Sequence, residues 1–531
     1  MALSFTNLLR KLRSTLTPGR LERNSRRSRI RGAAICFRPG EEILEDRCLL
    51  SAGALDLTFG GGDGIVTTRI GLRALAADLA ILPDGRLVAA GGVDKAGVLD
   101  RKDFALARYL PSGALDTSFG GDGIVTTDFK RNYDHINAVV VQVDGKIIAG
   151  GLTDLDTRDD FVSNFAFALA RYNVDGSLDT SFGGRKAAGK IVMDLSSQND
   201  GIVDLVLQAD RKILAVGGSS GNIALARYHS NGTLDTSFGT NGVRILDLGG
   251  FESAQNVVIQ PDGRIVISGL TNKSGSFDFV LARFNSVGVL DPTFGIAGIV
   301  TTDIQSGGIS LDDRAYNLAL QTNGQLVVAG DSGGQLVLGR YNTDGTLDTT
   351  FGTNQNGLVL TGMDKGDPSM AIDASGRIIA VGSSSSPASP DPLGAWDMDI
   401  SVARYLPNGG LDLTFGSNGV TTTDVSGTGD DAARAVALDS NGQIVVAGGA
   451  GFSSSAGDFV LVRYQGGAPL PVSGLQSAQV AGMRQTGAQR DHTALVDQVF
   501  HQPVDHHVAN LFGALLDEQL DSRRLWFKRR R

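Results

Sequence analysis

Aspartates recur in this chain at the points where short apolar runs end, and carboxylates in such an arrangement can bind a cation. Those that directly follow a short run are Asp128, Asp194, Asp247, Asp303 and Asp424. A polar stretch between two longer runs adds Asp154 and Asp156. Clustered carboxylates suit Ca²⁺, which takes about 6–8 oxygen ligands, and they equally suit a cationic partner. Loop aspartates more commonly cap turns in solvent and no EF-hand pattern is present, so we assign no cofactor and keep Ca²⁺ as a candidate.

Catalytic motifs are scarce in the central part of the chain. Only His135 and His229 lie there, each in an expected loop, and the other four histidines lie near the C-terminus. This part contains no His-x-x-x-His spacing, no Gly-x-Ser-x-Gly elbow and no P-loop. Two carboxylates could still serve a glycoside hydrolase or a lyase, but a hydrolase needs them about 5–9.5 Å apart in space. The sequence therefore predicts no catalytic residue, and an enzyme remains an alternative.

A repeat determines where these residues lie. The pattern Leu-Asp-x-x-Phe-Gly occurs seven times between residues 55 and 464. Its phenylalanines, 56 to 64 residues apart, are Phe59, Phe119, Phe182, Phe238, Phe294, Phe351 and Phe415. A period of this size marks an architecture built from repeated supersecondary units.

Each repeat unit predicts four strands, for example residues 123–127, 139–143, 146–150 and 167–172. Asp-Gly or Asn-Gly joins the second and third strands in five units, which is typical of a type I′ hairpin turn with positive φ at both positions. Ser375-Gly376 and Asp210-Arg211 replace it in the other two. Seven such units predict an all-β fold, a seven-bladed β-propeller of four-stranded blades. The terminal units are as regular as the others, which favours a closed ring over a solenoid with capping repeats.

Because successive strands alternate in direction, the loops fall on two faces. The uniform face carries the Asp-Gly turns and the Leu-Asp-x-x-Phe-Gly segments, which we expect to link the blades. There an arginine ends each fourth strand, and we predict one Arg–Asp contact per blade, with the phenylalanine between blades. The arginines are Arg108, Arg171, Arg227, Arg283, Arg340, Arg404 and Arg463, and the aspartates are Asp56, Asp116, Asp179, Asp235, Asp291, Asp348 and Asp412.

The variable face carries the remaining loops, which differ in length and are acidic. It includes the strand-ending aspartates and an insertion at residues 383–399 with Asp391, Asp397 and Asp399. Binding sites favour variable loops on a rigid scaffold. We therefore expect any ligand, a protein or a glycan, to bind on this face.

The two ends of the chain differ from the repeats. Residues 1–54 form a basic leader, and residues 465–531 begin as a linker and continue as an amphipathic helical tail after Pro503. The net charge of −9 argues against nucleic acid as the main partner. Both cysteines, Cys36 and Cys48, precede the repeats, and no apolar run is long enough to span a membrane. We expect the propeller to be monomeric.

Residues 44–51, Leu-Glu-Asp-Arg-Cys-Leu-Leu-Ser, resemble the LEPR-XLL motif near the N-termini of many large bacterial surface and secreted proteins. Asp46 stands where that motif has proline. The resemblance implies an exported protein, extracellular or on the bacterial cell surface.

Residues 55–464 resemble the delta-60 repeat proteins, a bacterial group with the pattern Leu-Asp-x-x-Phe-Gly, then Asp-Gly-Lys-Ile and Phe-x-x-x-Arg-Tyr. The resemblance implies a propeller and brings no catalytic residues with it. The leading hypothesis is an exported propeller that binds or scaffolds proteins, glycans or the cell envelope. The alternatives are a propeller glycoside hydrolase or lyase that uses acidic loop residues, and an adhesin stabilised by Ca²⁺.

Overall fold

The computed structural model describes residues 51–94, 101–129, 133–156, 164–184, 187–306, 308–361, 363, 368–390, 396–427, 429–453 and 456–467. All of them lie in the larger of two compact units, Leu50–Arg531. Residues 1–50, which include all of the LEPR-XLL-like motif except Ser51, and the expected tail helix lie outside the described residues. Within the described ranges, no helix has the length and hydrophobicity needed to cross a bilayer.

Thirty β-strands are present in these ranges, and all but two belong to seven four-stranded antiparallel sheets, the blades. Blade 1 contains β2 (Ala74–Ile81), β3 (Leu87–Asp94), β4 (Lys102–Tyr109) and β5 (Ile124–Thr127). Blade 2 contains β6 (Asp134–Val141), β7 (Ile147–Asp154), β8 (Phe165–Tyr172) and β9 (Lys190–Met193). Blade 3 contains β10 (Asp200–Leu207), β11 (Ile213–Ser219), β12 (Asn222–Tyr228) and β13 (Val243–Leu246).

The other four blades repeat this order. Blade 4 contains β14 (Glu252–Ile259), β15 (Ile265–Thr271), β16 (Asp278–Phe284) and β17 (Ile299–Thr302). Blade 5 contains β20 (Asp313–Leu320), β21 (Leu326–Ser332), β22 (Gln335–Tyr341) and β23 (Leu358–Leu360). Blade 6 contains β24 (Ser369–Ile372), β25 (Ile378–Pro390), β26 (Trp396–Tyr405) and β27 (Val420–Thr423). Blade 7 contains β28 (Ala432–Leu438), β29 (Ile444–Ser453), β30 (Ala456–Tyr464) and β1 (Ile65–Thr68).

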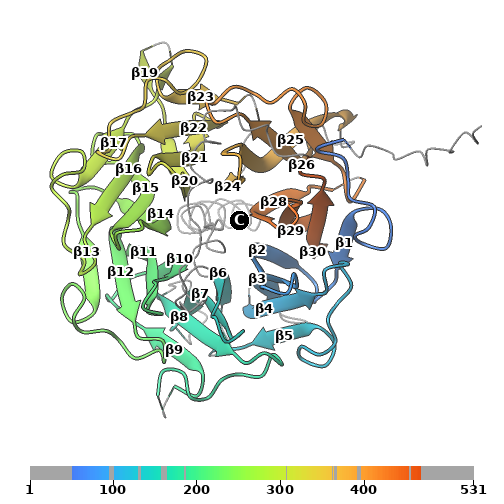
Figure 1. Cartoon of the computed structure of the whole chain (residues 1–531). Helices are drawn as coiled ribbons and strands as arrows, with labels where there is room; N and C mark the ends of the chain where they lie inside the picture. The colour runs from blue at the N-terminus through green and yellow to red at the C-terminus, as the bar shows by residue number, and fades with distance from the viewer. Residues whose placement is uncertain are drawn as a thin grey trace, which may run out of the picture. The chain divides into compact units, whose positions relative to one another are not determined.

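The first strand of each blade lies nearest the axis of the ring, and the short fourth strand lies at the rim (Figure 1). A separate hairpin, β18 (Gln305–Ser306) with β19 (Ile309–Ser310), is inserted between blades 4 and 5. The predicted all-β fold, a seven-bladed propeller of four-stranded blades, is confirmed.

The ring closes through its first strand. β1 pairs antiparallel with β30, from Ile65 opposite Val462 to Thr68 opposite Phe459. Residues 51–54 and 465–467 also bond into the ring, since the amide of Gly53 donates to the carbonyl of Gln465 at 2.7 Å. A blade is therefore offset by one strand from the sequence repeat, because the first strand of each repeat completes the preceding blade.

This offset corrects the expected role of the Leu-Asp-x-x-Phe-Gly segments. They connect the third and fourth strands within a blade and are not the links between blades. The links are the crossovers from each rim strand to the next innermost strand, such as residues 128–133 between β5 and β6. The strand-ending aspartates therefore lie in the crossovers.

The Asp-Gly turns also differ from the expected type I′ geometry. Gly85 has φ 84° and Gly145 has φ 79°, whereas the preceding aspartates do not have positive φ. The amide of Gly85 donates to the carbonyl of Leu82 at 2.9 Å, and the amide of Leu82 donates to the carbonyl of Arg86 at 2.8 Å. These bonds describe a type I turn followed by one left-handed residue. In blade 3 the left-handed residue is Arg211, with φ 67°.

The hydrophobic core lies between the blades. Seven clusters of buried side chains each combine residues of two neighbouring blades, one cluster at every junction. At the junction of blades 1 and 2, Val88 and Leu106 pack with Ile147, Ala170 and the recurrent Phe119. Strands buried on both sides explain why the sequence shows continuous apolar runs rather than alternation.

On the uniform face, arginine, aspartate and phenylalanine form one repeated contact in every blade. Arg Nε donates to Asp Oδ2 at 2.7–2.9 Å in all seven. Each guanidinium also lies 4.5–4.7 Å from the ring centre of a fully buried recurrent phenylalanine. The pairs are Arg108–Asp116, Arg171–Asp179, Arg227–Asp235, Arg283–Asp291, Arg340–Asp348, Arg404–Asp412 and Arg463–Asp56.

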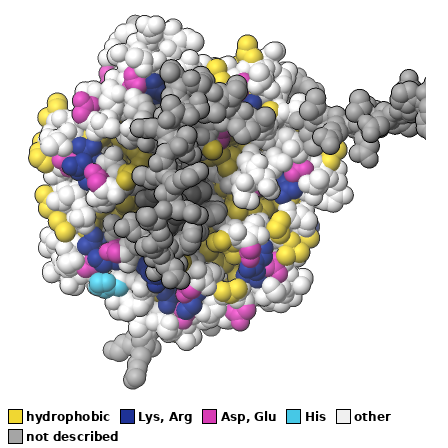
Figure 2. Space-filling view, in the orientation of Figure 1, with side chains coloured by type: hydrophobic (Ala, Val, Ile, Leu, Met, Phe, Trp, Pro, Cys, Tyr) yellow, Lys and Arg dark blue, Asp and Glu magenta, His cyan; other side chains and the backbone are white. Residues whose placement is uncertain are grey.

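The same arginines connect neighbouring blades. Arg108 Nη1 donates to the carbonyl of Val174 in blade 2, and Arg463 Nη1 donates to the carbonyl of Pro111 in blade 1. The glycine after the phenylalanine adds a second bond, for example from the amide of Gly120 to the carbonyl of Asp175 at 2.8 Å. Charged side chains of both signs lie next to one another at intervals around the face seen in Figure 2. The polar groups of the repeat are thus engaged in holding the blades together.

Candidate cation sites at the blade junctions

The five strand-ending aspartates occupy equivalent places in the fold. Each directly follows a rim strand and begins the crossover to the next blade; they are Asp128, Asp194, Asp247, Asp303 and Asp424. Asp128 is partly buried, and the other four are exposed. The structure does not bring these five together, because each lies at a different junction.

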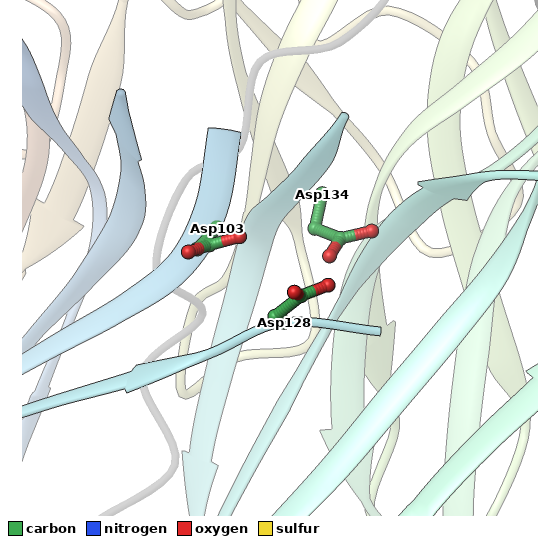
Figure 3. Close-up of side chains that lie close together, drawn as sticks. All are labelled: Asp103, Asp128 and Asp134. Carbon is green, nitrogen blue, oxygen red and sulfur yellow. The ribbon is translucent and has the colours of Figure 1, made fainter. Parts of the chain in front are cut away.

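Three of them instead join two further aspartates at their own junction. In each cluster, one carboxylate oxygen from every residue lies within 4.8 Å of the other two. In the first cluster the carboxylates point toward one another from β4, from the end of β5 and from β6 (Figure 3). The clusters are Asp103, Asp128 and Asp134 between blades 1 and 2, Asp278, Asp303 and Asp313 between blades 4 and 5, and Asp399, Asp424 and Asp431 between blades 6 and 7.

The sequence had pointed to only some of these residues. It missed Asp103, Asp134, Asp278, Asp313 and Asp431, and it noted Asp399 only as part of an insertion. One signal was available: Asp103, Asp278 and Asp399 each stand five residues before the arginine that ends the third strand of the blade. The inner aspartates follow the strand-ending ones at varying distance, so only the fold brings them to the cluster.

The innermost acid of each cluster anchors the crossover. Asp134 Oδ2 accepts the amide of Phe129 at 2.7 Å, and Asp313 Oδ2 accepts the amide of Ile304. The same bond recurs where a third carboxylate is missing, since Asp200 Oδ2 accepts the amide of Leu195 at 2.6 Å. Anchoring therefore explains the innermost acid of a cluster and does not explain the other two.

The third carboxylate distinguishes the junctions. At the junction of blades 2 and 3, the position of Asp103 is taken by Ala166, beside Asp194 and Asp200. At the junction of blades 3 and 4 it is taken by Asn222, beside Asp247 and Glu252. These two junctions close with two acids, and the third aspartate at the three cluster junctions has another cause.

Several buried oxygens of two clusters lack a hydrogen bond. Among the described residues, Asp313 Oδ1, Asp278 Oδ1 and the hydroxyl of Ser332 have no partner, and neither do Asp134 Oδ1 and the hydroxyl of Thr153. Asp134 and Asp313 are fully buried, and Asp278 is 5% exposed. Burying a carboxylate oxygen without a partner costs about 1–3 kcal/mol or more.

The third cluster differs in this respect. Asp431 Oδ2 accepts the amides of Val425 and Ser426, and Asp431 Oδ1 accepts the amide of Gly451 at 3.1 Å. Both oxygens of its innermost acid are therefore satisfied by backbone.

Crowded carboxylates disfavour the charged form. Burial, strengthened by the charges of Asp128 and Asp103, raises the pKa of Asp134 to about 6. Burial, strengthened by Asp303 and Asp278, likewise raises the pKa of Asp313 to about 6. Thr153 lies opposite Asp134 in the strand register, and Ser332 lies opposite Asp313. Their hydroxyls lower the pKa of the facing aspartate and so oppose the effect of burial, although they do not reach ordinary hydrogen-bond geometry.

Other residues singled out in the sequence have local roles. Asp154 ends β7, and its Oδ1 accepts the amides of Asp156 at 3.0 Å and Asn164 at 3.2 Å, so it fixes the base of the loop 155–164. Burial raises its pKa. His135 lies in β6 rather than in a loop, and burial lowers its pKa to about 3, so it is neutral near pH 7.

The comparison with protein families identifies the repeat. Five segments match the family described as a domain of unknown function (DUF5122) beta-propeller: residues 82–119, 142–182, 208–238, 260–294 and 321–351. These five segments of the chain are similar to the β-propeller repeat of this family. Every matched segment ends at the recurrent phenylalanine, so the crossovers that carry the strand-ending aspartates lie outside the matches.

Several solved structures are similar to this chain at low sequence identity. A protein of unknown function from Dyadobacter fermentans DSM 18053 is 13% identical, with 76% of this chain and 99% of that chain covered and a TM-score of 0.40. A streptogramin B lyase is 9% identical, with 75% and 97% covered and a TM-score of 0.41. A protein from Lactobacillus plantarum is 13% identical, with 72% and 96% covered and a TM-score of 0.39. No curated protein sequence matches the chain.

Proposed function

We propose that this β-propeller is an exported bacterial binding or scaffold module whose variable face holds a protein, a glycan or the cell envelope. The observation that carries the proposal is the contrast between the two faces of one ring. On the uniform face, all seven blades make the same Arg–Asp–Phe contact, and its polar groups serve the ring itself. A contact that recurs in every repeat of one chain is typical of a structural role.

The variable face departs from that regularity blade by blade. β11 and β12 are joined by the two-residue turn Ser220-Gly221, whereas residues 155–164 separate β7 from β8. β25 and β26 extend to 13 and 10 residues, and β18–β19 adds a hairpin found in no other described crossover. Loops that vary on a rigid scaffold are where binding residues concentrate. The LEPR-XLL-like motif at residues 44–51 supports export.

The geometry of the clusters does not favour the alternative of a glycoside hydrolase. A hydrolase places two carboxyl groups about 5–9.5 Å apart on either side of the bond that is cleaved. In the three clusters the nearest oxygens lie within 4.8 Å of one another, and the innermost acid is fully buried. The innermost acids therefore lack the access to substrate that the reaction needs.

Binding can be tested with the full chain on a glycan array and in co-sedimentation with bacterial envelope fractions. In one variant, residues 155–164 are replaced by the Ser-Gly turn of blade 3, which should abolish or strongly weaken the binding seen with the wild type. A matched control changes the uniform face: Leu413→Ser, at a side chain that is 67% exposed, should bind as the wild type does. Loss of binding in the control, with binding retained in the loop variant, would place the site on the uniform face and contradict the proposal. Detection of the chain in the cytoplasm alone would contradict export.

A further inference from the structure

We propose that two of the aspartate clusters are Ca²⁺ sites: Asp103, Asp128 and Asp134 between blades 1 and 2, and Asp278, Asp303 and Asp313 between blades 4 and 5. The inference does not depend on the binding role proposed above. It rests on the geometry of the clusters and on buried oxygens that the protein itself leaves without partners.

The site between blades 4 and 5 shows the argument most fully. Asp303 accepts hydrogen bonds from Gln305 Nε2 and Ser310 Oγ, both at 2.7 Å, which hold its carboxylate at the cluster. Asp313 uses Oδ2 to accept the amide of Ile304, and Asp278 uses Oδ2 to accept the hydroxyl of Ser274. The other oxygen of each, with the hydroxyl of Ser332, is buried and has no hydrogen-bond partner.

The site between blades 1 and 2 repeats this chemistry. Asp134 Oδ1 and the hydroxyl of Thr153 are buried without partners at the equivalent places. Lys190 lies nearby, but its Nζ donates to the backbone carbonyl of Asp128 at 2.9 Å and not to a carboxylate. Three carboxylates and a hydroxyl form an oxygen-only set of the kind that hard divalent cations prefer.

The ligand set favours Ca²⁺ over Mg²⁺. Ca²⁺ takes about 6–8 oxygen ligands at about 2.3–2.6 Å in a flexible geometry, whereas Mg²⁺ requires near-ideal octahedral geometry and usually keeps several waters. The oxygens of each cluster lie within 4.8 Å of one another, a span that one Ca²⁺ can bridge. A cation would also remove the repulsion between three carboxylates, where the junctions of blades 2 and 3 and of blades 3 and 4 have only two.

The test is the calcium stoichiometry of the full chain by isothermal titration calorimetry after dialysis against EDTA. The wild type should take up two Ca²⁺ per chain, Asp103→Asn and Asp278→Asn one each, and the double variant none. Asp458→Asn is the matched control, because Asp458 holds the same position in blade 7, where the other two places are Arg69 and Ala74, and it should take up two. Asp424→Asn, at the third cluster, should also leave two.

Thermal unfolding separates this result from misfolding. In EDTA, the melting temperature of Asp278→Asn should equal or exceed that of the wild type, because one of three repelling carboxylates is neutral. In millimolar Ca²⁺ the order should reverse, since only the wild type gains stability at this junction from the bound ion. Absence of calcium uptake by the wild type, or an unchanged stoichiometry in the double variant, would overturn the proposal.

Discussion

Arg463 and Asp56 are 407 residues apart in the chain and form the same ion pair that the other six blades form across eight residues. The distance from Arg463 Nε to Asp56 Oδ2 is 2.7 Å, against 2.8–2.9 Å elsewhere. Because β1 completes blade 7, this pair and the pairing of β1 with β30 join the two ends of the ring. A change that is local in any other blade therefore becomes a change in ring closure here.

We expect Asp56→Asn to lower the free energy of unfolding by about 3 kcal/mol, because the Arg463 side chain, only 11% exposed, loses its counter-charge. It should also release β1, which is held by four residue pairs. Urea unfolding measures the first effect, and hydrogen exchange of the β1 amides measures the second. Asp291→Asn, at the same position in blade 4, is the control and should lose stability without faster exchange in β1. Equal β1 protection in the two variants would contradict the closing role.

The recurrent phenylalanines are expected to be among the most costly side chains to truncate. Phe238 is fully buried between blades, with the Arg227 guanidinium 4.6 Å from its ring centre. Phe238→Ala should cost about 3–5 kcal/mol of unfolding free energy, and Phe238→Leu, which retains most of the volume, should cost less. Leu413→Ala, at an exposed site of the same sequence pattern, should stay within about 0.5 kcal/mol of the wild type. A Phe238→Ala loss as small as that would show that the pocket is not tightly packed.

The fold could be predicted from the sequence because the same four-strand pattern occurs in seven repeats. Buried strands, turn residues and the Arg–Asp–Phe positions all recur, so each unit supports the assignment of the others. What the sequence left open was the boundary of a blade. Residues 65–68 look like the start of the first unit, and only their pairing with Phe459–Val462 shows that they complete the last blade.

The clusters were harder to predict because their members come from three separate strands. Asp128 could be recognised as a strand-ending residue because it follows β5. Asp103 lies in the preceding strand, β4, and Asp134 begins β6 in the next blade. Neither stands in a pattern that repeats in all seven units. Convergence of such residues depends on the offset between blade and repeat, which sequence spacing does not reveal.

Blade 3 contains a removable strain. Arg211 occupies the left-handed position of the turn with φ 67°, and its side chain is exposed. Because this conformation costs a residue other than glycine about 1–2 kcal/mol, Arg211→Gly should raise the free energy of unfolding by about 1 kcal/mol after the greater freedom of glycine in the unfolded chain is allowed for. The reciprocal change, Gly263→Arg, should lower the free energy of unfolding by a similar amount. The nearest atom to an added Cβ at Gly263 is 4.0 Å away, so there is no steric clash and the cost arises from the positive φ of the backbone alone. Urea unfolding of both variants checks the prediction, and a destabilised Arg211→Gly would refute it.

The Arg–Asp pairs predict a specific loss of stability in acid. Burial alone would raise the pKa of Asp116, but hydrogen bonds from Ser118 and the neighbouring Arg86 and Arg108 outweigh it and lower the pKa to about 2, from an ordinary value of 3.8. The pKa of the corresponding aspartate is lowered in each of the other six blades for similar reasons.

Since the folded-state pKa values lie below the unfolded ones, this stability is fully present above roughly pH 4 and is lost as the pH falls toward 2. The melting temperature in EDTA should therefore fall steeply between pH 4 and pH 2, and a flat profile there would contradict the prediction. Asp134 and Asp313, with pKa values of about 6, are already protonated at pH 4 in the folded state, and the remaining titration of their unfolded forms near 3.8 slightly opposes the loss of stability. The loss of stability in acid thus arises from the Arg–Asp pairs of the uniform face, and Asp116→Asn should make the transition shallower, whereas Asp134→Asn should not.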